Sequence, residues 1–414
     1  MNVHIITIGD ELLIGQVIDT NSAWMAQELE KEGFQVIRKT TVGDVEKNIQ
    51  EALDTAISQA QIILLTGGIG PTKDDITQKT LCNYFNCHTY FSEEVYQNIH
   101  TLFSASGKEI NPLTRRQAIV PDKCTIIQNK VGTAPCTWFE ENRKILISMP
   151  GVPHEMKWLM THEIIPRLKK QFRQNLFIHH KTTWISGFTE SMLATQLAPF
   201  EKQLPPHIKL AYLPQPGLIR LRLSVYTNEE TTAIQTITEQ NEKLHQILNG
   251  HILAKEDKPL EEQIGETLLA RKLTIGTAES CTGGRIAAML TSIPGSSRYF
   301  TGSIISYNNN IKHHLLGVSP SDLSHYGAVS RQVVEQMARG AIHALGCTCA
   351  VSTSGIAGPS GGTPQKPVGT TWIAVAHHNN IISRCHHFTS TRETNQAHAA
   401  NTALLMLLEL IRKA

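Results

Sequence analysis

The sequence has few of the features that mark nucleic-acid-binding or membrane proteins. Aromatic residues make up 6% of its 414 residues, charged residues make up 18%, and the formal net charge at pH 7 is +2. This near-neutral balance argues against a nucleic-acid-binding protein, which usually carries a clustered basic excess. The chain also lacks an uninterrupted apolar run of about 18 residues, so it predicts no membrane-spanning helix.

The eight cysteines show no Cys-x-x-Cys spacing, the pattern that favours a structural zinc site. The segment Met1–Ile8 is apolar but short, and it runs directly into Gly9–Glu11. That pattern favours a first strand over a signal peptide. A long chain with unpatterned cysteines and no export signal is expected to be cytoplasmic, with its thiols reduced.

The length predicts more than one domain, because a single hydrophobic core rarely grows beyond about 250–300 residues. The first block, residues 1–172, alternates apolar runs with amphipathic segments. This is the β-α-β order of a parallel sheet that is covered on both faces. We expect strands over 3–8, 34–41 and 61–65, and helices over 22–32 and 45–60.

Two further blocks follow. Residues 173–253 predict a small α+β module with strands over 182–186 and 218–226, helices over 191–197 and 229–248, and a turn over 212–218 before the second strand. A polar linker over 254–259 leads into residues 256–414, where a helix over 260–270 precedes renewed strand–helix alternation. The pattern as a whole predicts a multi-domain α/β protein.

In the third block, a β-branched run ends at Ser280, two glycines follow, and a helical pattern begins at Arg285. Ser280 is therefore expected at a strand-to-helix turn, where the first amides of the helix are unpaired and point outward. A serine there can act as a nucleophile, with the amides holding an oxyanion or a phosphate. The alternative is an ordinary hydroxyl residue that caps the helix.

In the first block, glycines and acidic residues follow two of the predicted strands. The segment 66–77 opens with Thr-Gly-Gly after an apolar run, and the segment 9–15 closes the first strand in the same manner. Glycines let the backbone approach a ligand closely, and ligands of open α/β sheets bind at the carboxyl ends of strands. Asp74 and Asp75 then favour a divalent cation that bridges protein carboxylates and ligand phosphates. Alternatively, these two carboxylates only stabilise the positive N-terminal end of a helix.

In order and spacing, these motifs resemble the CinA (competence/damage-inducible) family over nearly the whole chain. The resemblance implies a molybdopterin-binding-like three-layer α/β domain over 1–172, a KH-like α+β module over 173–253 and an α/β amidohydrolase domain over 256–414. The supporting segments are 9–16, 19–21, 66–75, 129–135 and 149–156 in the first block, and 278–284, 294–297, 306–312, 316–318, 327–330, 354–362 and 366–370 in the third.

For the first domain, the resemblance implies a metal-dependent ADP-ribose pyrophosphatase that yields AMP and ribose 5-phosphate. A Mg, Mn or Co ion at Asp74 and Asp75 would neutralise the phosphates and activate water. Cys136 stands where the family commonly has glycine, and a side chain there is expected to narrow the pocket. The implied ligand-binding residues are Gly9, Asp10, Glu11, Thr66, Gly67, Gly68, Gly70, Pro71, Thr72, Asn129, Gly132 and Thr133.

For the third domain, the resemblance implies hydrolysis of nicotinamide mononucleotide to nicotinate mononucleotide and ammonia, with no cofactor. Ser280 is the implied nucleophile, Lys312 its base and Tyr307 a helper in proton transfer. A lysine whose pKa is lowered by desolvation can take the serine proton. Without the family spacing, Lys312 would read as a solvated lysine and Tyr307 as a core residue. The implied substrate-binding residues are Glu279, Cys281, Thr282, Gly283, Gly284, Ser354, Gly355, Gly358 and Arg392.

Three positions near this site depart from the family pattern. Ser354 replaces the usual threonine, Ser390-Thr391 precedes Arg392 in place of Gly-Asp, and Gln396 occupies a position where arginine is usual. The hydroxyl of Ser354 keeps the donor that a threonine would supply. The other two changes fall on the side that is expected to hold the substrate phosphate.

Other functions stay open at the level of the sequence. The middle module shows no evident Gly-x-x-Gly loop, so we read it as a spacer or dimer contact, with RNA binding as an alternative. A symmetric homodimer is the general expectation for such a chain. The first block also suits a molybdopterin-handling enzyme, and the family name suggests a non-catalytic adaptor in DNA uptake or damage response.

Overall fold

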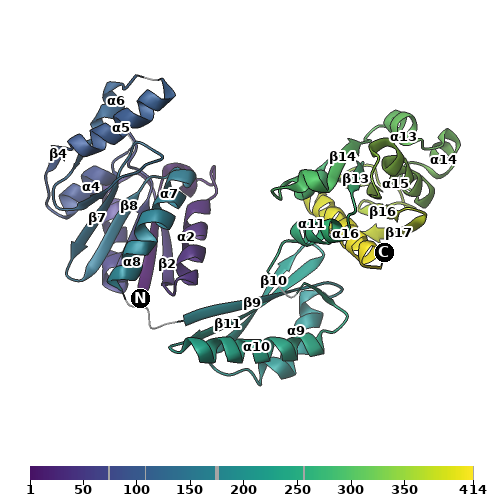
Figure 1. Cartoon of the computed structure of the whole chain (residues 1–414), viewed down its shortest axis with the longest axis horizontal. Helices are drawn as coiled ribbons and strands as arrows, with labels where there is room; N and C mark the ends of the chain where they lie inside the picture. Colours follow the sequence, from purple (N-terminus) through teal and green to yellow (C-terminus); the bar gives the residue numbers. More distant parts are fainter. Residues whose placement is uncertain (73–74, 108, 173–176, 255–256, 414) are drawn as a thin grey trace. The chain divides into compact units, whose positions relative to one another are not determined.

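The computed structural model describes residues 1–72, 75–107, 109–172, 177–254 and 257–413 (Figure 1). These residues form two compact units, one made of residues 1–179 with 224–237 and the other of residues 180–223 with 238–414. Each unit has its own hydrophobic core. Within the described residues, no helix is long and apolar enough to cross a bilayer.

The N-terminal region confirms the five elements predicted over residues 3–65, each within two residues of its expected ends. Its elements are β1 (Asn2–Ile8), α1 (Asp10–Leu13), α2 (Thr20–Lys31), β2 (Gln35–Val42), α3 (Glu46–Gln59), β3 (Ile62–Thr66), α4 (Thr77–Tyr84), β4 (Thr89–Phe91), α5 (Glu93–Ser106), α6 (Pro112–Arg116), β5 (Ile119–Pro121), β6 (Thr125–Ile127), β7 (Cys136–Glu141), β8 (Lys144–Met149), α7 (Pro153–Leu159), the π-helical turn η1 (Met160–Ile164) and α8 (Ile165–Gln171).

Six of these strands form one sheet in the order β2-β1-β3-β8-β7-β6. Strands β2, β1, β3 and β8 are parallel to one another, whereas β7 pairs antiparallel with both of its neighbours, β8 and β6. The expected parallel sheet is therefore confirmed for β2, β1, β3 and β8, and β7 adds an antiparallel strand that was not expected. The short strand Cys136–Glu141 connects to Lys144–Met149 by a tight turn, which permits only antiparallel pairing.

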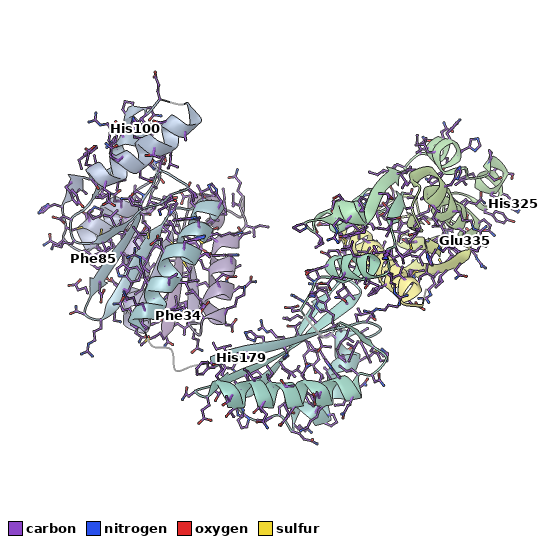
Figure 2. All side chains as sticks on the ribbon, viewed as in Figure 1. Phe34, Phe85, His100, His179, His325 and Glu335 are labelled. Carbon is purple, nitrogen blue, oxygen red and sulfur yellow. The ribbon has the colours of Figure 1, made fainter. Side chains whose placement is uncertain are left out.

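Alternating side chains of β3 place helices on both faces of this sheet. Ile62 and Leu64 pack into a core with α2, α7 and α8, whereas Ile63 and Leu65 pack into a second core with α3 and α4. Phe34, labelled in Figure 2, is fully buried in the first core. The result is the expected three-layer α/β arrangement, which leaves the carboxyl ends of the parallel strands open for a site.

The middle region contains a four-stranded sheet in the order β10-β11-β9-β12 with two long helices. Residues 212–215, expected in a turn, instead complete strand β10, because the actual turn is the Pro216-Gly217 pair. Gly217 adopts a left-handed φ of 77° there. The elements are β9 (Phe177–Ile185), α9 (Glu190–Glu201), β10 (Ile208–Gln215), β11 (Leu218–Thr227), α10 (Glu230–Ile247) and β12 (Ile252–Ala254).

The C-terminal region begins with the predicted helix over 260–270 and again forms three layers. Its elements are α11 (Leu260–Ala270), β13 (Ile275–Glu279), α12 (Arg285–Thr291), the 3₁₀ turn η2 (Ser296–Arg298), β14 (Phe300–Ile305), α13 (Asn309–Leu316), α14 (Pro320–Tyr326), α15 (Arg331–Leu345), β15 (Cys349–Gly355), β16 (Thr370–His377), β17 (Asn380–His387) and α16 (Arg392–Lys413). The sheet order is β14-β13-β15-β16-β17, with β14, β13 and β15 parallel and the last two strands antiparallel.

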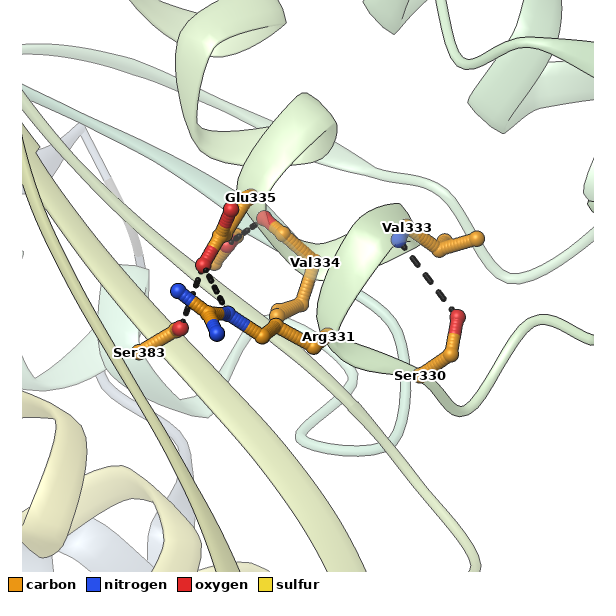
Figure 3. Close-up of polar contacts among 7 residues, drawn as sticks. Ser330, Arg331, Val333, Val334, Glu335 and Ser383 are labelled. Carbon is orange, nitrogen blue, oxygen red and sulfur yellow. Dashed lines mark hydrogen bonds and ion pairs between the residues drawn. The ribbon is translucent and has the colours of Figure 1, made fainter. Parts of the chain in front are cut away.

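Helices α11, α12 and α16 cover one face of this sheet, and α15 covers the other. Polar contacts fix α15 at its start (Figure 3). The Ser330 hydroxyl accepts from the Val333 amide at 3.4 Å, and Glu335 accepts from Arg331 at 2.7 Å and from Ser383 on β17 at 2.5 Å. Glu335 thus ties the helix to the sheet edge.

Candidate functional sites

The first candidate site lies at the carboxyl end of β13, which lies between β14 and β15 in the C-terminal sheet. Ser280 follows the strand directly, and its amide donates to the Thr353 carbonyl on the neighbouring strand β15 at 3.0 Å. Gly283 and Gly284 take left-handed φ values of 63° and 95°, so the chain turns at once into α12. The predicted strand–turn–helix around Ser280 is thus present.

Lys312 meets Ser280 from helix α13. Its Nζ lies 3.3 Å from Ser280 Oγ, 2.5 Å from the Ser306 carbonyl oxygen and 3.4 Å from that of Tyr307. The side chain is 1% exposed, and within the described residues these three oxygens are its hydrogen-bond partners. Lys312 is therefore buried beside the serine, which excludes the alternative of a solvated lysine.

Burial shifts Lys312 toward its neutral form relative to a lysine in water. Burial lowers the pKa of Lys312 below the ordinary lysine value, and the Cys281 thiol opposes this shift only in part. A neutral amine can donate two N–H groups to the two carbonyls and accept the Ser280 proton with its lone pair. The pair has the geometry of a general base and its nucleophile.

Glu279, expected to bind substrate, instead caps helix α12. It is 0% exposed, and its carboxylate accepts from the amides of Gly284 at 3.0 Å, Ile286 at 3.1 Å and Ala287 at 2.9 Å. The expectation that the first amides of this helix are unpaired was therefore wrong. A strand-end carboxylate folds back onto them, an anion at the positive end of the helix.

Cys281 and Thr282, the next residues of the turn, differ in the polar groups that they leave free to contact a ligand. Burial raises the pKa of the Cys281 thiol to about 11, so this thiol stays protonated. Thr282 shares a buried hydrogen bond of 2.8 Å with Thr353, and within the described residues its amide has no partner. The Cys281 amide likewise has no partner among the described residues, so both amides are left as donors for an oxyanion near Ser280.

Tyr307 and Arg392 meet over the outer side of the site. Tyr307 is 61% exposed, so it is not the core residue of the alternative interpretation, and its hydroxyl accepts from Arg392 Nη2 at 3.0 Å. Arg392 Nη1 donates to the Gly358 carbonyl at 2.9 Å. The structure thus brings three predicted residues, Tyr307, Gly358 and Arg392, together.

Ser354 and Gln396 form hydrogen bonds to backbone carbonyls around the site. Ser354 is buried and donates to the Ala328 carbonyl at 2.7 Å, and a Cβ on neighbouring Gly355 would collide with the Thr371 hydroxyl. Gln396 donates to the Cys281 carbonyl at 2.8 Å and so links α16 to the nucleophile turn. The sequence pattern marked Gln396 only as a departure from arginine and did not indicate this contact.

The second candidate site, here called the glycine pocket, has a volume of about 530 Å³ in the N-terminal unit. Of the predicted ligand-binding residues, Asp10, Asn129 and Gly132 do not line it, although Asn129 donates to the lining residue Glu155 at 2.6 Å. Asp74 lies outside the described residues. The predicted residues that do line it are Gly9, Glu11, Thr66, Gly67, Gly68, Gly70, Pro71, Thr72, Thr133 and Asp75.

The glycine-rich turn of this pocket is partly satisfied by the protein itself. The Gly67 amide donates to the Met149 carbonyl and the Thr72 amide to Asp75, whereas within the described residues the amides of Gly68, Ile69 and Gly70 have no partner. Gly67 has a φ of 108°, and a Cβ there would collide with the Ile8 carbonyl oxygen. The turn therefore needs glycine and presents free amides, as an anion site requires.

Acidic side chains gather on one wall of the glycine pocket. Burial raises the pKa of Asp44, and the charges of Asp10, Glu11 and Asp75 raise it further against a hydrogen bond from the Asp10 amide. Asp44 was missed in the sequence, although it follows strand β2 in the way that Asp10 follows β1. Such mutual repulsion is what a bound cation would relieve.

No ready-made metal cage accompanies this wall. Within the described residues, no group of three or more His, Cys, Asp or Glu side chains is arranged to hold a metal ion. Mg²⁺ commonly takes only one or two protein carboxylates and completes its shell with water and phosphate oxygens. The carboxylates fit a cation that arrives with a phosphate ligand.

The glycine pocket contains other polar residues that the motifs did not assign. Asn21 donates to the Gly151 carbonyl at 2.7 Å, while its buried Oδ1 has no partner among the described residues. Burial raises the pKa of Glu155, against the hydrogen bond from Asn129. Both residues lie inside quoted motifs, and only the folded pocket shows that they line it.

Cys136 does not narrow the glycine pocket. It is fully buried in the core beneath α7 and α8, and it is absent from the pocket lining. In β7 its neighbours alternate across the sheet, so Thr137 faces away from Cys136. The expectation of a narrowed pocket was therefore wrong.

Comparisons with known proteins give the chain its family. Three family profiles match it: the probable molybdopterin binding domain over residues 4–170, the damage-inducible protein CinA KH domain over 180–254 and the CinA C-terminal domain over 257–411. A CinA-like protein of Flavobacterium psychrophilum is 42% identical over 100% of this chain and 99% of its own length. A CinA-like protein of Cytophaga hutchinsonii is 40% identical over the same shares.

Solved structures match shorter parts of the chain. A competence/damage inducible protein from Agrobacterium tumefaciens is 39% identical, covering 36% of this chain and 93% of its own, with a TM-score of 0.36. The assignment rests on the full-length sequence matches and on the three profiles in their order. The chain belongs to the CinA family.

Proposed function

We propose that the C-terminal region hydrolyses the carboxamide of nicotinamide mononucleotide to nicotinate mononucleotide and ammonia. The observation that carries the proposal is the buried pair of Lys312 Nζ and Ser280 Oγ, 3.3 Å apart, with a lowered lysine pKa. The choice of substrate comes from the family resemblance. The site supplies the chemistry of an amidase with a serine nucleophile.

In the acylation step, neutral Lys312 takes the proton of Ser280 as Oγ attacks the carboxamide carbon. The carbonyl oxygen becomes an oxyanion, and the amides of Cys281 and Thr282, which have no partner among the described residues, are donors close in sequence to hold it. Lys312 then gives its proton to the amide nitrogen, the carbon–nitrogen bond breaks, and ammonia leaves. The product is a nicotinoyl ester on Ser280.

Deacylation repeats the same proton movements with water. Lys312 accepts a proton from water as the oxygen attacks the ester carbon, and returns it to Ser280 Oγ as the ester bond breaks. The carbonyls of Ser306 and Tyr307 hold Nζ throughout, because each has its own hydrogen bond to it. One lysine thus acts as base and acid in both halves of the reaction.

Arg392 and the glycine-rich segment 358–362 would receive the substrate phosphate. Arg392 already bonds the Gly358 carbonyl and the Tyr307 hydroxyl, so its guanidinium is oriented before a ligand arrives. A forked guanidinium suits a phosphate group. Tyr307 would then connect phosphate recognition to the chain segment that holds Lys312.

A second activity is proposed for the glycine pocket: cleavage of the pyrophosphate of ADP-ribose. The free amides of Gly68, Ile69 and Gly70 beside an acidic wall favour it. Asp44 and Asp75, with Asp74 outside the described residues, would hold a Mg, Mn or Co ion. Such an ion supplies charge neutralisation and an activated water when bound. The Gly67 turn positions the amides, and Thr72 holds the carboxylate of Asp75.

Product analysis with the full-length chain tests both activities. Incubation with nicotinamide mononucleotide should yield equal amounts of nicotinate mononucleotide and ammonia, and ADP-ribose with added metal should yield AMP and ribose 5-phosphate. Specific molybdopterin binding without ADP-ribose cleavage would favour a molybdopterin-handling role for the first unit. Failure of a folded chain to release ammonia would remove the amidase proposal and favour an adaptor.

A further inference from the structure

A second cavity adjoins the glycine pocket in the N-terminal unit. This cavity, here called the second chamber, has a volume of about 620 Å³. It shares one wall with the glycine pocket, formed by Ile69–Thr72, Asp75 and Gln117. A ligand whose phosphates rest on this wall therefore lies at the boundary of the two spaces. Outside this shared wall, the sequence motifs assigned no ligand-binding residue to the second chamber.

The floor of the second chamber carries unsatisfied polar groups. Thr137 on β7 and Ser148 on β8 are direct cross-strand partners, and both line the chamber. Both residues are more than nine-tenths buried, as is Gln117 in the shared wall. Within the described residues, their oxygens Oγ1, Oγ and Oε1 have no hydrogen-bond partner. Buried groups of this kind call for a ligand or an ordered water.

Two basic side chains line the same chamber. Lys79 comes from α4 and Arg116 from the end of α6, and within the described residues neither forms an ion pair or a side-chain hydrogen bond. The preceding residue, Arg115, is engaged differently, because its guanidinium lies 5.6 Å from the ring centroids of Phe91 and of Tyr96. Arg116 and Lys79 thus provide two positive charges without an ion-pair partner among the described residues, and Asp75 is the one acidic residue among the described residues of the lining.

The rest of the lining is largely apolar, with Leu81, Leu113 and Val120 among its members. Sites of this composition hold an organic group against the apolar wall and orient it by a few polar contacts. The combination here fits a nucleotide-like group that carries a phosphate of its own. A guanidinium is well suited to a phosphomonoester, as in the proteins that distinguish a ribose 2′-phosphate from a free hydroxyl.

We propose that the second chamber binds a phosphomonoester on the substrate, so that the first unit selects ADP-ribose-type ligands with a ribose 2′-phosphate over unphosphorylated ones. The pyrophosphate lies over the shared glycine wall, and the extra phosphate meets Arg116 and Lys79. This inference rests on the pyrophosphatase activity proposed above and names its substrate class. No bond to the extra phosphate is made or broken.

The test compares ADP-ribose with ADP-ribose 2′-phosphate on the full-length chain. Hydrolysis rates are measured with Mg²⁺, Mn²⁺ and Co²⁺ in turn, and binding is measured by calorimetry. One charge-assisted contact corresponds to about tenfold or more in affinity, so the 2′-phosphate should raise kcat/KM or tighten Kd by at least that factor. Arg116→Ala should remove most of this preference, and Lys79→Ala should reduce it.

Arg115→Ala is the matched control, because it removes the same charge one residue away from the chamber. It should leave the preference unchanged. Equal kcat/KM and Kd for the two ligands would overturn the inference. So would an equal loss of the 2′-phosphate preference in Arg115→Ala and Arg116→Ala. Tighter binding of the 2′-phosphate without cleavage of either ligand would support the chamber and refute the pyrophosphatase activity. Absence of both binding and cleavage would refute both.

Discussion

Lys312 Nζ lies 3.3 Å from Ser280 Oγ, although the two residues come from different elements, a helix and a strand end. Lys312 Nζ donates to the carbonyl of Ser306 at 2.5 Å, and the Ser306 amide donates to the Glu279 carbonyl at 2.8 Å. Ser280 and Ser306 thus directly follow the adjacent, hydrogen-bonded strands β13 and β14. The pairing of these strands fixes the distance between Ser280 and the carbonyl that accepts from Lys312.

The pH dependence of ammonia release should report Lys312. Because burial lowers its pKa, the neutral and active form should dominate at a pH below the ordinary lysine value of about 10.4. The rate should rise with pH to a plateau, with its inflection below that value. A rate that keeps rising through about pH 10.4 would show that Lys312 is not desolvated in the working enzyme.

Lys312→Met should abolish the amidase, by about a thousandfold or more, yet stabilise the fold at neutral pH. The pKa of Lys312 is lowered in the folded protein, so the unfolded chain binds the lysine proton more tightly than the native state does. The stability of the wild-type protein therefore rises with pH, up to the ordinary lysine pKa. Thermal denaturation should show a higher Tm for the variant at pH 7. That gain should shrink toward pH 10, and a variant less stable than wild type at pH 7 would contradict it.

Glu279→Ala should destabilise the C-terminal region by about 3 kcal/mol or more, because three amides of α12 lose a buried acceptor. Glu279→Gln keeps one acceptor oxygen and should lose less. Denaturant unfolding measures the stability, and steady-state kinetics should show a lower kcat with little change in KM in the Gln variant. An increase in KM with unchanged kcat would instead indicate that Glu279 binds the substrate.

Gly67→Ala should destabilise the N-terminal unit by about 3 kcal/mol, since it adds a collision with Ile8 to a left-handed φ. Gly107→Ala is the matched control. Its φ of 65° carries the same kind of strain, but nothing lies within 4 Å of the added carbon, so it should cost only about 1 kcal/mol. Equal losses in unfolding experiments would mean that the close approach to Ile8 is not important.

Asp44→Asn should stabilise the N-terminal unit at neutral pH. The pKa of Asp44 is raised in the folded state, mainly by burial, so its contribution to stability falls as pH rises from its ordinary value through the folded one. The gain should disappear in acid, where wild-type Asp44 is protonated. Added Mg²⁺, Mn²⁺ or Co²⁺ should raise the Tm of wild type more than that of the variant, and equal shifts would place the cation elsewhere.

The sequence predicted the order of elements well because the apolar periodicity is strong where both faces of a sheet are covered. Ile62–Leu65 is a continuous apolar run because its alternate residues enter two different cores. The antiparallel edges were missed. A strand such as Cys136–Glu141 looks the same in sequence whichever way it pairs.

The sites were predicted less completely, and the misses have one cause. A motif shows which residues are near each other in the chain, whereas Glu279 folds back onto amides five to eight residues later. Gln396 reaches Cys281 across 115 positions, and Asp44 becomes a neighbour of Asp10 only through the pairing of β1 with β2. Such contacts follow from the fold.

The most direct test of the account is ammonia release from nicotinamide mononucleotide by the full-length chain, compared between wild type, Ser280→Ala and the exposed-serine control Ser292→Ala. The account predicts release by wild type and Ser292→Ala at equal rates, and none above background by Ser280→Ala. Undiminished release by a folded Ser280→Ala variant would contradict the proposed nucleophile and the mechanism built on it.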